Sequence, residues 1–235
     1  LSEVAKRTRV DVGFQSLAGT VEALRGMVGL ELAGVAELAR GFDGLYFETG
    51  QGSEVTNGAA AGVDMVTLEA RCYGAARSIR RSVAKRRGVA AQAVWMIVND
   101  VAGFIGPEVF RSPAQLLRAC LEDTVMAKLH GLCMGLDVCS TFHMGIEPGE
   151  LARLTRAIAQ QAAPAYLMAV AGNADPMLGY LTTSFRQHPQ LRRATGAKMT
   201  ARMAQRLGEL GVRVDEGSGS GSGCVCSAFN RAKGN

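Results

Sequence analysis

The stretch SPAQLLRACLEDTVMAKLHGLCMGLDVCS, residues 112–140, indicates the fold class because a helix and a strand follow each other in it. Ser112 can cap a helix and Pro113 suits its first position, so we predict a helix that runs to about His130. The short apolar run from Cys133 to Ser140 then predicts a buried strand. A helix that leads into such a strand is typical of α/β proteins with parallel sheets.

The same alternation extends on both sides of this stretch, from the first residue to about residue 185. Helical spacing of apolar positions predicts further helices over Val63 to Arg86 and over Pro148 to Ala163. We predict five strands, which are Val10 to Phe14, Gly44 to Glu48, part of Val94 to Ile105, Cys133 to Ser140, and Tyr166 to Ala171. Parallel strands joined by crossover helices follow from this order.

Two architectures fit five βα units without an interdomain linker, an α/β barrel and an open doubly wound sheet. We favour a partial TIM (β/α)8-type barrel over residues 1–211. An eight-stranded barrel requires three more units, and we expect them upstream because the chain opens at Leu1 without an initiator Met. Glycine and serine alternate from Gly217 to Gly223, which predicts a flexible tail over residues 212–235.

Composition and charge restrict the classes of function. Of the 235 residues, 48% are hydrophobic and 20% are charged, a balance typical of a globular protein. The net charge is +5, but the basic side chains gather in predicted helices without interleaved aromatic residues, so we predict solvated helix faces and no nucleic-acid partner. The two basic groups are Arg77, Arg80, Arg81, Lys85, Arg86 and Arg87, and Arg186, Arg192, Arg193, Lys198 and Arg202.

Cysteine usage and hydropathy indicate a reducing compartment and no membrane span. The chain has no secretory signal, so we expect free thiols in a cytoplasmic protein. The cysteines lack the paired spacing of a zinc site, and we predict no metal site. No apolar run approaches the roughly 20 residues that a bilayer requires. The cysteines are Cys72, Cys120, Cys133, Cys139, Cys224 and Cys226.

Polar residues at the ends of predicted strands are the candidates for function, because parallel α/β folds bind ligands at the carboxyl ends of their strands. They are Gln15, Ser16, Glu48, Asn99, Asp100 and Asp137. Glu48 and Asp137 lie in apolar surroundings, where a carboxylate needs a partner. Together they would make one end of the sheet anionic and could hold a protonated amine. Alternatively, Glu48 forms a salt bridge to a helix arginine and Asp137 caps a backbone amide.

Other chemistries have weaker support. Gly50-Gln51-Gly52 follows a strand but lacks the third glycine of a dinucleotide fingerprint, which leaves a phosphorylated substrate at Gly50 to Ser53 as an alternative. His143 is the only histidine in a plausible loop position, and a lone histidine more often completes a hydrogen-bond network than catalyses. Serine, histidine and aspartate do not form an evident nucleophilic triad.

Several strings together resemble the large subunit of ethanolamine ammonia-lyase, over about residues 8–190. They are LYFETGQGSE at 45–54, LEAR at 68–71, GFIGPE at 103–108, LED at 121–123, MGLDVC at 134–139 and LTTSF at 181–185. The resemblance implies a barrel that binds adenosylcobalamin and converts ethanolamine to acetaldehyde and ammonia by radical chemistry. It also implies a small-subunit partner, an oligomer, and a cytoplasmic location that could be inside a bacterial microcompartment.

The resemblance assigns roles to single residues. Glu48 is similar to the family glutamate at the substrate amine and hydroxyl, and Asp137 to the aspartate at the ammonium. Gln15, Ser16, Thr56 and Gly179 correspond to the cofactor-contacting positions, and some relatives carry Asn where this chain has Gly179. The chain lacks Asp-x-His-x-x-Gly, which suits a family that binds the cofactor with its own base attached.

The chain departs from the family in one main respect. An Arg, a Gln and an Asn-Pro pair that complete the family's sites belong to upstream strands that this sequence does not contain. We therefore expect little or no turnover from this chain alone. The alternative is a non-catalytic remnant or assembly module of the same fold, in which the carboxylates serve only the structure.

Overall fold

The computed structural model describes residues 11–51, 62–103, 110–141, 144–176 and 179–211. The chain divides into two compact units, residues 1–184 and 185–235. The division lies before the boundary at residue 211 that the sequence suggests. Each unit is described by itself.

The first unit contains a parallel sheet whose strands are arranged in chain order. The strands are β1 (Val12–Ser16), β2 (Gly44–Thr49), β3 (Trp95–Ala102), β4 (Cys133–Val138) and β5 (Tyr166–Leu167). Each strand pairs in parallel with the next, so the order does not reverse within the described strands as it does in a doubly wound sheet. This mixed α/β arrangement is compatible with part of a barrel.

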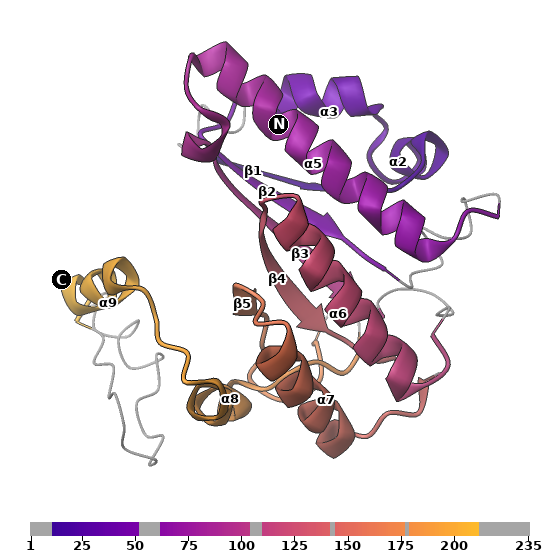
Figure 1. Ribbon diagram of the computed structural model, residues 1–235, viewed down its shortest axis with the longest axis vertical. Helices are drawn as coiled ribbons and strands as arrows, with labels where there is room; N and C mark the ends of the chain where they lie inside the picture. Colours follow the sequence, from indigo (N-terminus) through magenta and orange to yellow (C-terminus); the bar gives the residue numbers. More distant parts are fainter. Residues whose placement is uncertain (1–10, 52–61, 104–109, 142–143, 177–178, 212–235) are drawn as a thin grey trace. The chain divides into compact units, whose positions relative to one another are not determined.

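One face of the sheet is covered by helices, and Figure 1 shows α5 and α6 lying across it. Phe47 of β2, Val98 of β3 and Leu136 of β4 are buried there with Tyr73 of α5 and Leu116 of α6 in one hydrophobic core. We call this face the helix face, and the opposite face the site face. The helices of this unit are α2 (Val21–Val28), α3 (Leu32–Ala39), α5 (Met65–Arg87), α6 (Pro113–Leu129) and α7 (Pro148–Gln161).

The helix ends follow local capping chemistry. The Ser112 hydroxyl accepts a hydrogen bond from the Gln115 amide at 3.4 Å, and Pro113 occupies the first turn of α6, which confirms the predicted start of this helix. Asp64 caps α5 in the same way and accepts from the Thr67 amide at 2.9 Å. Gly88 ends α5 with φ 65°, a left-handed conformation that glycine adopts without a steric cost.

Strand limits differ from the prediction where pairing decides them. β1 begins two residues later than predicted, because its register with β2 starts at Val12 opposite Gly44. β3 ends at Ala102, and the next residue, Gly103, has φ 78°. β5 contains only Tyr166 and Leu167, the two residues that pair with β4. The apolar run after them is therefore not a strand throughout.

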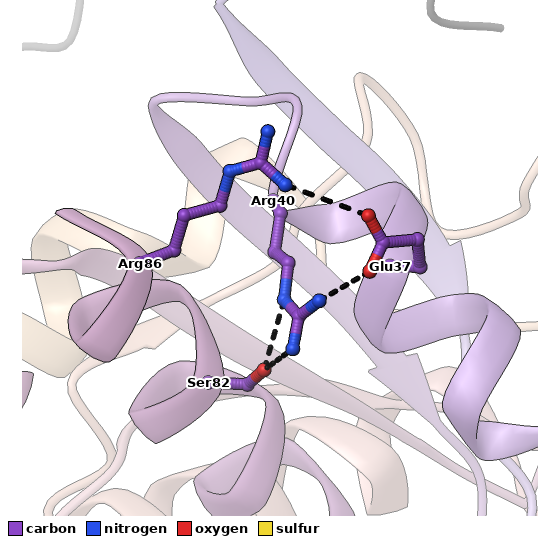
Figure 2. A network of polar contacts seen from close by, with 4 residues as sticks. All are labelled: Glu37, Arg40, Ser82 and Arg86. Atoms are coloured by element: carbon purple, nitrogen blue, oxygen red, sulfur yellow. Dashed lines mark hydrogen bonds and ion pairs between the residues drawn. The ribbon is translucent and has the colours of Figure 1, made fainter.

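A polar network joins α3 to α5 on the helix layer (Figure 2). The Arg40 guanidinium donates to the Ser82 hydroxyl through Nε at 3.1 Å and Nη2 at 2.7 Å, and it also pairs with Glu37. Arg86 reaches the other oxygen of Glu37 at 3.5 Å. Arg86 and Glu37 are exposed, so their ion pair stabilises the contact by at most about 1 kcal/mol. Most of the first basic group is solvated, as the composition predicts.

The second unit contains the short 3-10 helix η4 (Phe185–Gln187), α8 (His188–Thr195) and α9 (Ala201–Glu209). Within its described residues only Leu191 is a buried apolar side chain. The predicted tail, residues 212–235, lies outside the described residues. Across the described ranges, no helix has both the length and the apolar character to cross a bilayer. The four described cysteines, Cys72, Cys120, Cys133 and Cys139, are free thiols.

Candidate functional site

Glu48 and Asp137 lie near the carboxyl ends of β2 and β4, on the site face. Side chains alternate along a strand, and partners in register share a face. Glu48 is in register with Asn99 of β3, and Asp137 with Val101, two residues further along β3. The two carboxyls lie two strands apart across the sheet and are offset along it by two residues, and they interact electrostatically. The structure brings together the two carboxylates that the sequence singles out.

The Glu48 carboxyl is partly buried and is held by a tyrosine of its own strand. The Tyr46 hydroxyl donates to Oε1 of Glu48 at 3.3 Å. Burial raises the pKa of Glu48 above its ordinary value, the bond from Tyr46 lowers it in part, and the charge of Asp137 raises it. Among the described residues no arginine pairs with Glu48, so the salt-bridge alternative is not found there.

A second tyrosine extends this contact across the sheet. The Tyr166 hydroxyl donates to the Val98 carbonyl at 3.3 Å and interacts with the Tyr46 hydroxyl. The Tyr166 ring lies over Gly135, where an added Cβ would come within 2.1 Å of the ring carbon Cζ. Burial raises the pKa of Tyr46 to about 12 and that of Tyr166 above its usual range. Both phenols therefore stay neutral, and the glycine provides the space that lets them meet.

Two hydroxyl groups hold the Asp137 carboxylate. The Tyr180 hydroxyl donates to Oδ2 at 3.0 Å, and the Thr182 hydroxyl donates to Oδ1. Asp137 is 6% exposed, and these two donors take the place of the backbone amide that the alternative prediction named. Each carboxylate oxygen has two acceptor positions, so the two bonds leave capacity for another donor.

The segment after β5 positions these two hydroxyls. Leu181 and Ser140 exchange backbone hydrogen bonds at 2.8 and 2.9 Å in an antiparallel bridge next to the end of β4. Tyr180 and Thr182 flank Leu181, and alternation along extended backbone places both on one side, toward Asp137. Gly179 precedes them with φ 74°, a conformation that glycine and, to a lesser extent, asparagine adopt.

The expected cofactor positions fall in different places. Ser16 is in register with Glu48 on the site face, whereas Gln15 is in register with Phe47 and shares the helix face. The backbone of Gly179 is uncovered, since an added Cβ would meet nothing within 4 Å. Thr56 lies outside the described residues. Register therefore places Ser16, but not Gln15, on the site face, and the cofactor roles of all four residues stay predictions.

Asn99 lies between the two carboxylates and has no visible structural role. It stands on β3, the strand between β2 and β4, in register with Glu48. Its side chain is 1% exposed, and neither its Nδ2 nor its Oδ1 has a hydrogen-bond partner in the described part of the protein. A buried amide without partners is rare in folded proteins and costs free energy.

A second carboxyl cluster lies behind the site, on the helix face. Asp100 of β3, Glu69 of α5 and Asp123 of α6 are each no more than 3% exposed. Asp100 accepts a hydrogen bond from the Gln51 amide at 3.1 Å and shares one with Asp123. Within the described ranges no three histidine, cysteine or acidic side chains could hold a metal ion. The cluster is a set of buried acids that contact one another.

Burial disfavours the charged forms of the acids in this cluster. Burial raises the pKa of Glu69, Asp100 and Asp123 above their ordinary values, and the charge of Asp100 raises the values of the other two. Asp123 then acts as the hydrogen-bond donor to Asp100, as carboxyl pairs that share a proton do.

Sequence reasoning missed the hydroxyl groups of the site. Tyr46 could have been found, because it precedes Glu48 by two residues and so shares its face. Thr182 lies in the LTTSF string of the resemblance, but nothing in the sequence indicates that it contacts Asp137. Tyr180 and Tyr166 carry no sequence signal, since their contacts depend on the bridge at Leu181 and on the missing side chain at Gly135.

Comparison with known proteins matches this arrangement to one family. A family model described as ethanolamine ammonia lyase large subunit (EutB) matches residues 1–220. The ethanolamine ammonia-lyase large subunits of Escherichia coli K12 and Salmonella typhimurium LT2 are each 36% identical over 211 residues, which is 86% of this chain and 43% of theirs. The chain thus spans less than half the length of these curated relatives.

A solved structure from Bacteroides thetaiotaomicron VPI-5482, provisionally described as an alpha-L-fucosidase, is more distant. It is 15% identical with a TM-score of 0.40, and the match covers 83% of this chain and 61% of that one. At this distance the match bears on neither the site nor the activity.

Proposed function

Since the chain belongs to the ethanolamine ammonia-lyase large-subunit family, we propose that it supplies the substrate-ammonium end of an active site that converts ethanolamine to acetaldehyde and ammonia. The observation that carries the proposal is the convergence of Glu48 and Asp137 on the site face. The resemblance and the charge argument select the same two residues independently of the structure.

The two carboxylates suit a small cation. A primary ammonium has three N–H donors, and Glu48 and Asp137 have acceptor positions that their tyrosine and threonine partners leave free. Charge-assisted hydrogen bonds in a site with little water are about twice as strong as neutral ones. The cation in turn favours the ionised form of Glu48, whose pKa burial otherwise raises.

The surrounding hydroxyls keep the carboxylates in position. Tyr180 and Thr182 fix the orientation of Asp137, and Tyr46 does the same for Glu48. Such preorganisation lowers the entropy that substrate binding must remove. These three residues are positioning residues, because they act on the substrate through the carboxylates.

Adenosylcobalamin is the cofactor that the family implies, and the residues on this chain fit a ligand over the site face. Ser16 shares that face at the end of β1, and the backbone at Gly179 is open to an approaching group. When bound, this cofactor supplies the radical that abstracts hydrogen from the substrate carbon. The protein's own residues hold the ammonium, orient the substrate and exclude water from it.

The remaining assignments follow from the family. We propose that this chain forms part of a TIM-type α/β barrel. We also propose that it assembles with the family's small subunit into an oligomer, in the cytoplasm or inside a bacterial microcompartment. The alternative function is a non-catalytic assembly module of the same fold. Measured affinity for ethanolamine separates the two, because a module whose carboxylates serve only the fold needs none.

The decisive experiment measures both turnover and binding. The chain is produced alone and together with the part of the Escherichia coli large subunit that its match does not cover, and each preparation receives small subunit, adenosylcobalamin and ethanolamine. We expect acetaldehyde from the completed preparation and little or none from the chain alone. Turnover that is equal in both would contradict the expected need for the remaining strands. Absence of both turnover and ethanolamine binding in the completed preparation would refute the lyase assignment.

A further inference from the structure

The Asn99 amide is buried without hydrogen-bond partners among the described residues, and it lies on the strand between those of Glu48 and Asp137. A hydrophobic residue would fill the same space without an unpaired donor and acceptor. A protein is expected to keep a residue that lowers its folding stability, such as the unpaired Asn99, when that residue binds a ligand.

Among the described residues of this chain, the two carboxylates leave one requirement of an amino alcohol unmet. Ionised carboxylates only accept hydrogen bonds, so they satisfy the ammonium but cannot donate to the lone pairs of a hydroxyl oxygen. Tyr46, Tyr180 and Thr182 could donate, but their hydroxyl protons are directed to the carboxylates. Among the described residues, Asn99 Nδ2 is an unpaired donor in register with Glu48.

We propose that Asn99 is a substrate-binding residue that donates its Nδ2–H to the hydroxyl oxygen of the amino alcohol held by Glu48 and Asp137. The residue thereby distinguishes an amino alcohol from a simple amine. The inference rests on the proposed function, because it needs the ammonium to bind the two carboxylates.

The test compares ethanolamine with ethylamine, which has the ammonium but lacks the hydroxyl. Dissociation constants for both are measured by calorimetry on the completed preparation, for the unchanged protein and for Asn99→Ala. We expect the unchanged protein to prefer ethanolamine and Asn99→Ala to lose about five- to tenfold of that preference, the usual effect of one hydrogen bond in a buried site. Ethylamine affinity should change less than twofold.

Thermal unfolding of the ligand-free protein provides a readout that separates a binding role from a structural one. Removal of an unpaired buried amide should leave Tm unchanged or raise it, so Asn99→Ala should not be less stable than Ile97→Val, a matched control on the same strand and face. A marked fall in Tm would assign Asn99 to the fold and overturn the inference.

The outcomes distinguish the inference from the proposed function. If the unchanged protein binds neither amine, the proposed function fails, and the inference fails with it. If the unchanged protein prefers ethanolamine and Asn99→Ala keeps the full preference, only the role of Asn99 is wrong. Equal loss of affinity for both amines would likewise overturn it, because the hydroxyl would then not be the group that Asn99 contacts.

Discussion

Buried or partly buried carboxyls lie on both faces of the sheet, two from strands on the site face and three from a strand and two helices on the helix face, yet their environments differ. On the site face, Asp137 receives two hydroxyl donors and Glu48 one. On the helix face, Glu69 and Asp100 each have a carboxylate oxygen without a partner among the described residues. The comparison teaches that position at a strand end does not make a carboxylate available for a ligand. Exposure and hydrogen-bond donors decide which carboxylates are charged and accessible.

The strongest way to break this comparison is to neutralise the site-face pair. Glu48→Gln combined with Asp137→Asn should weaken ethanolamine binding at least about 100-fold, since each charge-assisted hydrogen bond contributes roughly 1.5–3 kcal/mol. Calorimetry on the completed preparation measures the change. Glu69→Gln on the helix face serves as the control and should leave affinity unchanged. Equal effects of the two changes would show that the faces do not differ in function.

A pH titration tests the charge of Glu48. Because its pKa is raised, Glu48 becomes protonated at a higher pH than an ordinary glutamate does. The neutral carboxylic acid cannot form an ion pair with the ammonium. Ethanolamine affinity should therefore be constant above this pKa and should fall about tenfold for each pH unit below it. In Glu48→Gln this dependence should disappear. A dependence that persists in the variant would place the titrating group elsewhere.

The pH dependence of folding stability tests the buried acids of the helix face. The pKa values of Glu69, Asp100 and Asp123 are raised in the folded protein, so they stabilise the fold at pH below the unfolded values. That stabilisation is lost as the pH rises through the raised values. Asp123→Asn keeps a donor to Asp100 and removes one ionisable group, so at pH 8 it should raise the free energy of unfolding by about 1–2 kcal/mol.

Denaturant unfolding of the chain at pH 5 and pH 8 measures this effect. The gain from Asp123→Asn should shrink at pH 5, because the free-energy cost that the raised pKa of Asp123 imposes on folding falls as the pH falls. A variant that is less stable than the unchanged protein at both pH values would contradict the assignment of Asp123 as the proton-carrying member of the cluster.

The smallest expected effect concerns the positioning of Asp137. Thr182→Val is nearly isosteric but removes the hydroxyl that donates to Oδ1. It should weaken ethanolamine binding about two- to fivefold, because a loosely held Asp137 carboxylate lowers the binding free energy by about 0.5–1 kcal/mol. Thr182→Ser keeps the hydroxyl and should bind as the unchanged protein does. If calorimetry finds the two variants equal, the hydroxyl does not position the carboxylate.

The sequence predicted the strands and the carboxylates because both depend on local patterns. Apolar runs placed every strand of the described sheet, and Glu48 and Asp137 stood out as charges within such runs. The limits of the strands could not be predicted, because pairing ends them. The run from Tyr166 to Ala171 is apolar almost throughout, but only its first two residues are in register with residues of β4.

The rest of the site depends on contacts between distant parts of the chain. Tyr180 and Thr182 reach Asp137 across more than forty residues. The acids of the helix face come from one strand and two helices, so no spacing along the chain connects them. Asn99 and Asp100 were both recognised as polar residues at a strand end. Only the alternation of side chains, once the register is known, assigns them to opposite faces.

The close approach of Tyr166 to Gly135 has an evolutionary consequence. Because the ring occupies the volume that a side chain at position 135 would need, the two positions should change together in related sequences. Chains with a larger residue at position 135 should carry a small residue at position 166, and they should have lost the phenol that reaches toward Glu48. An alignment of relatives would therefore show, at these two positions, which members keep the tyrosine that contacts Tyr46 next to Glu48.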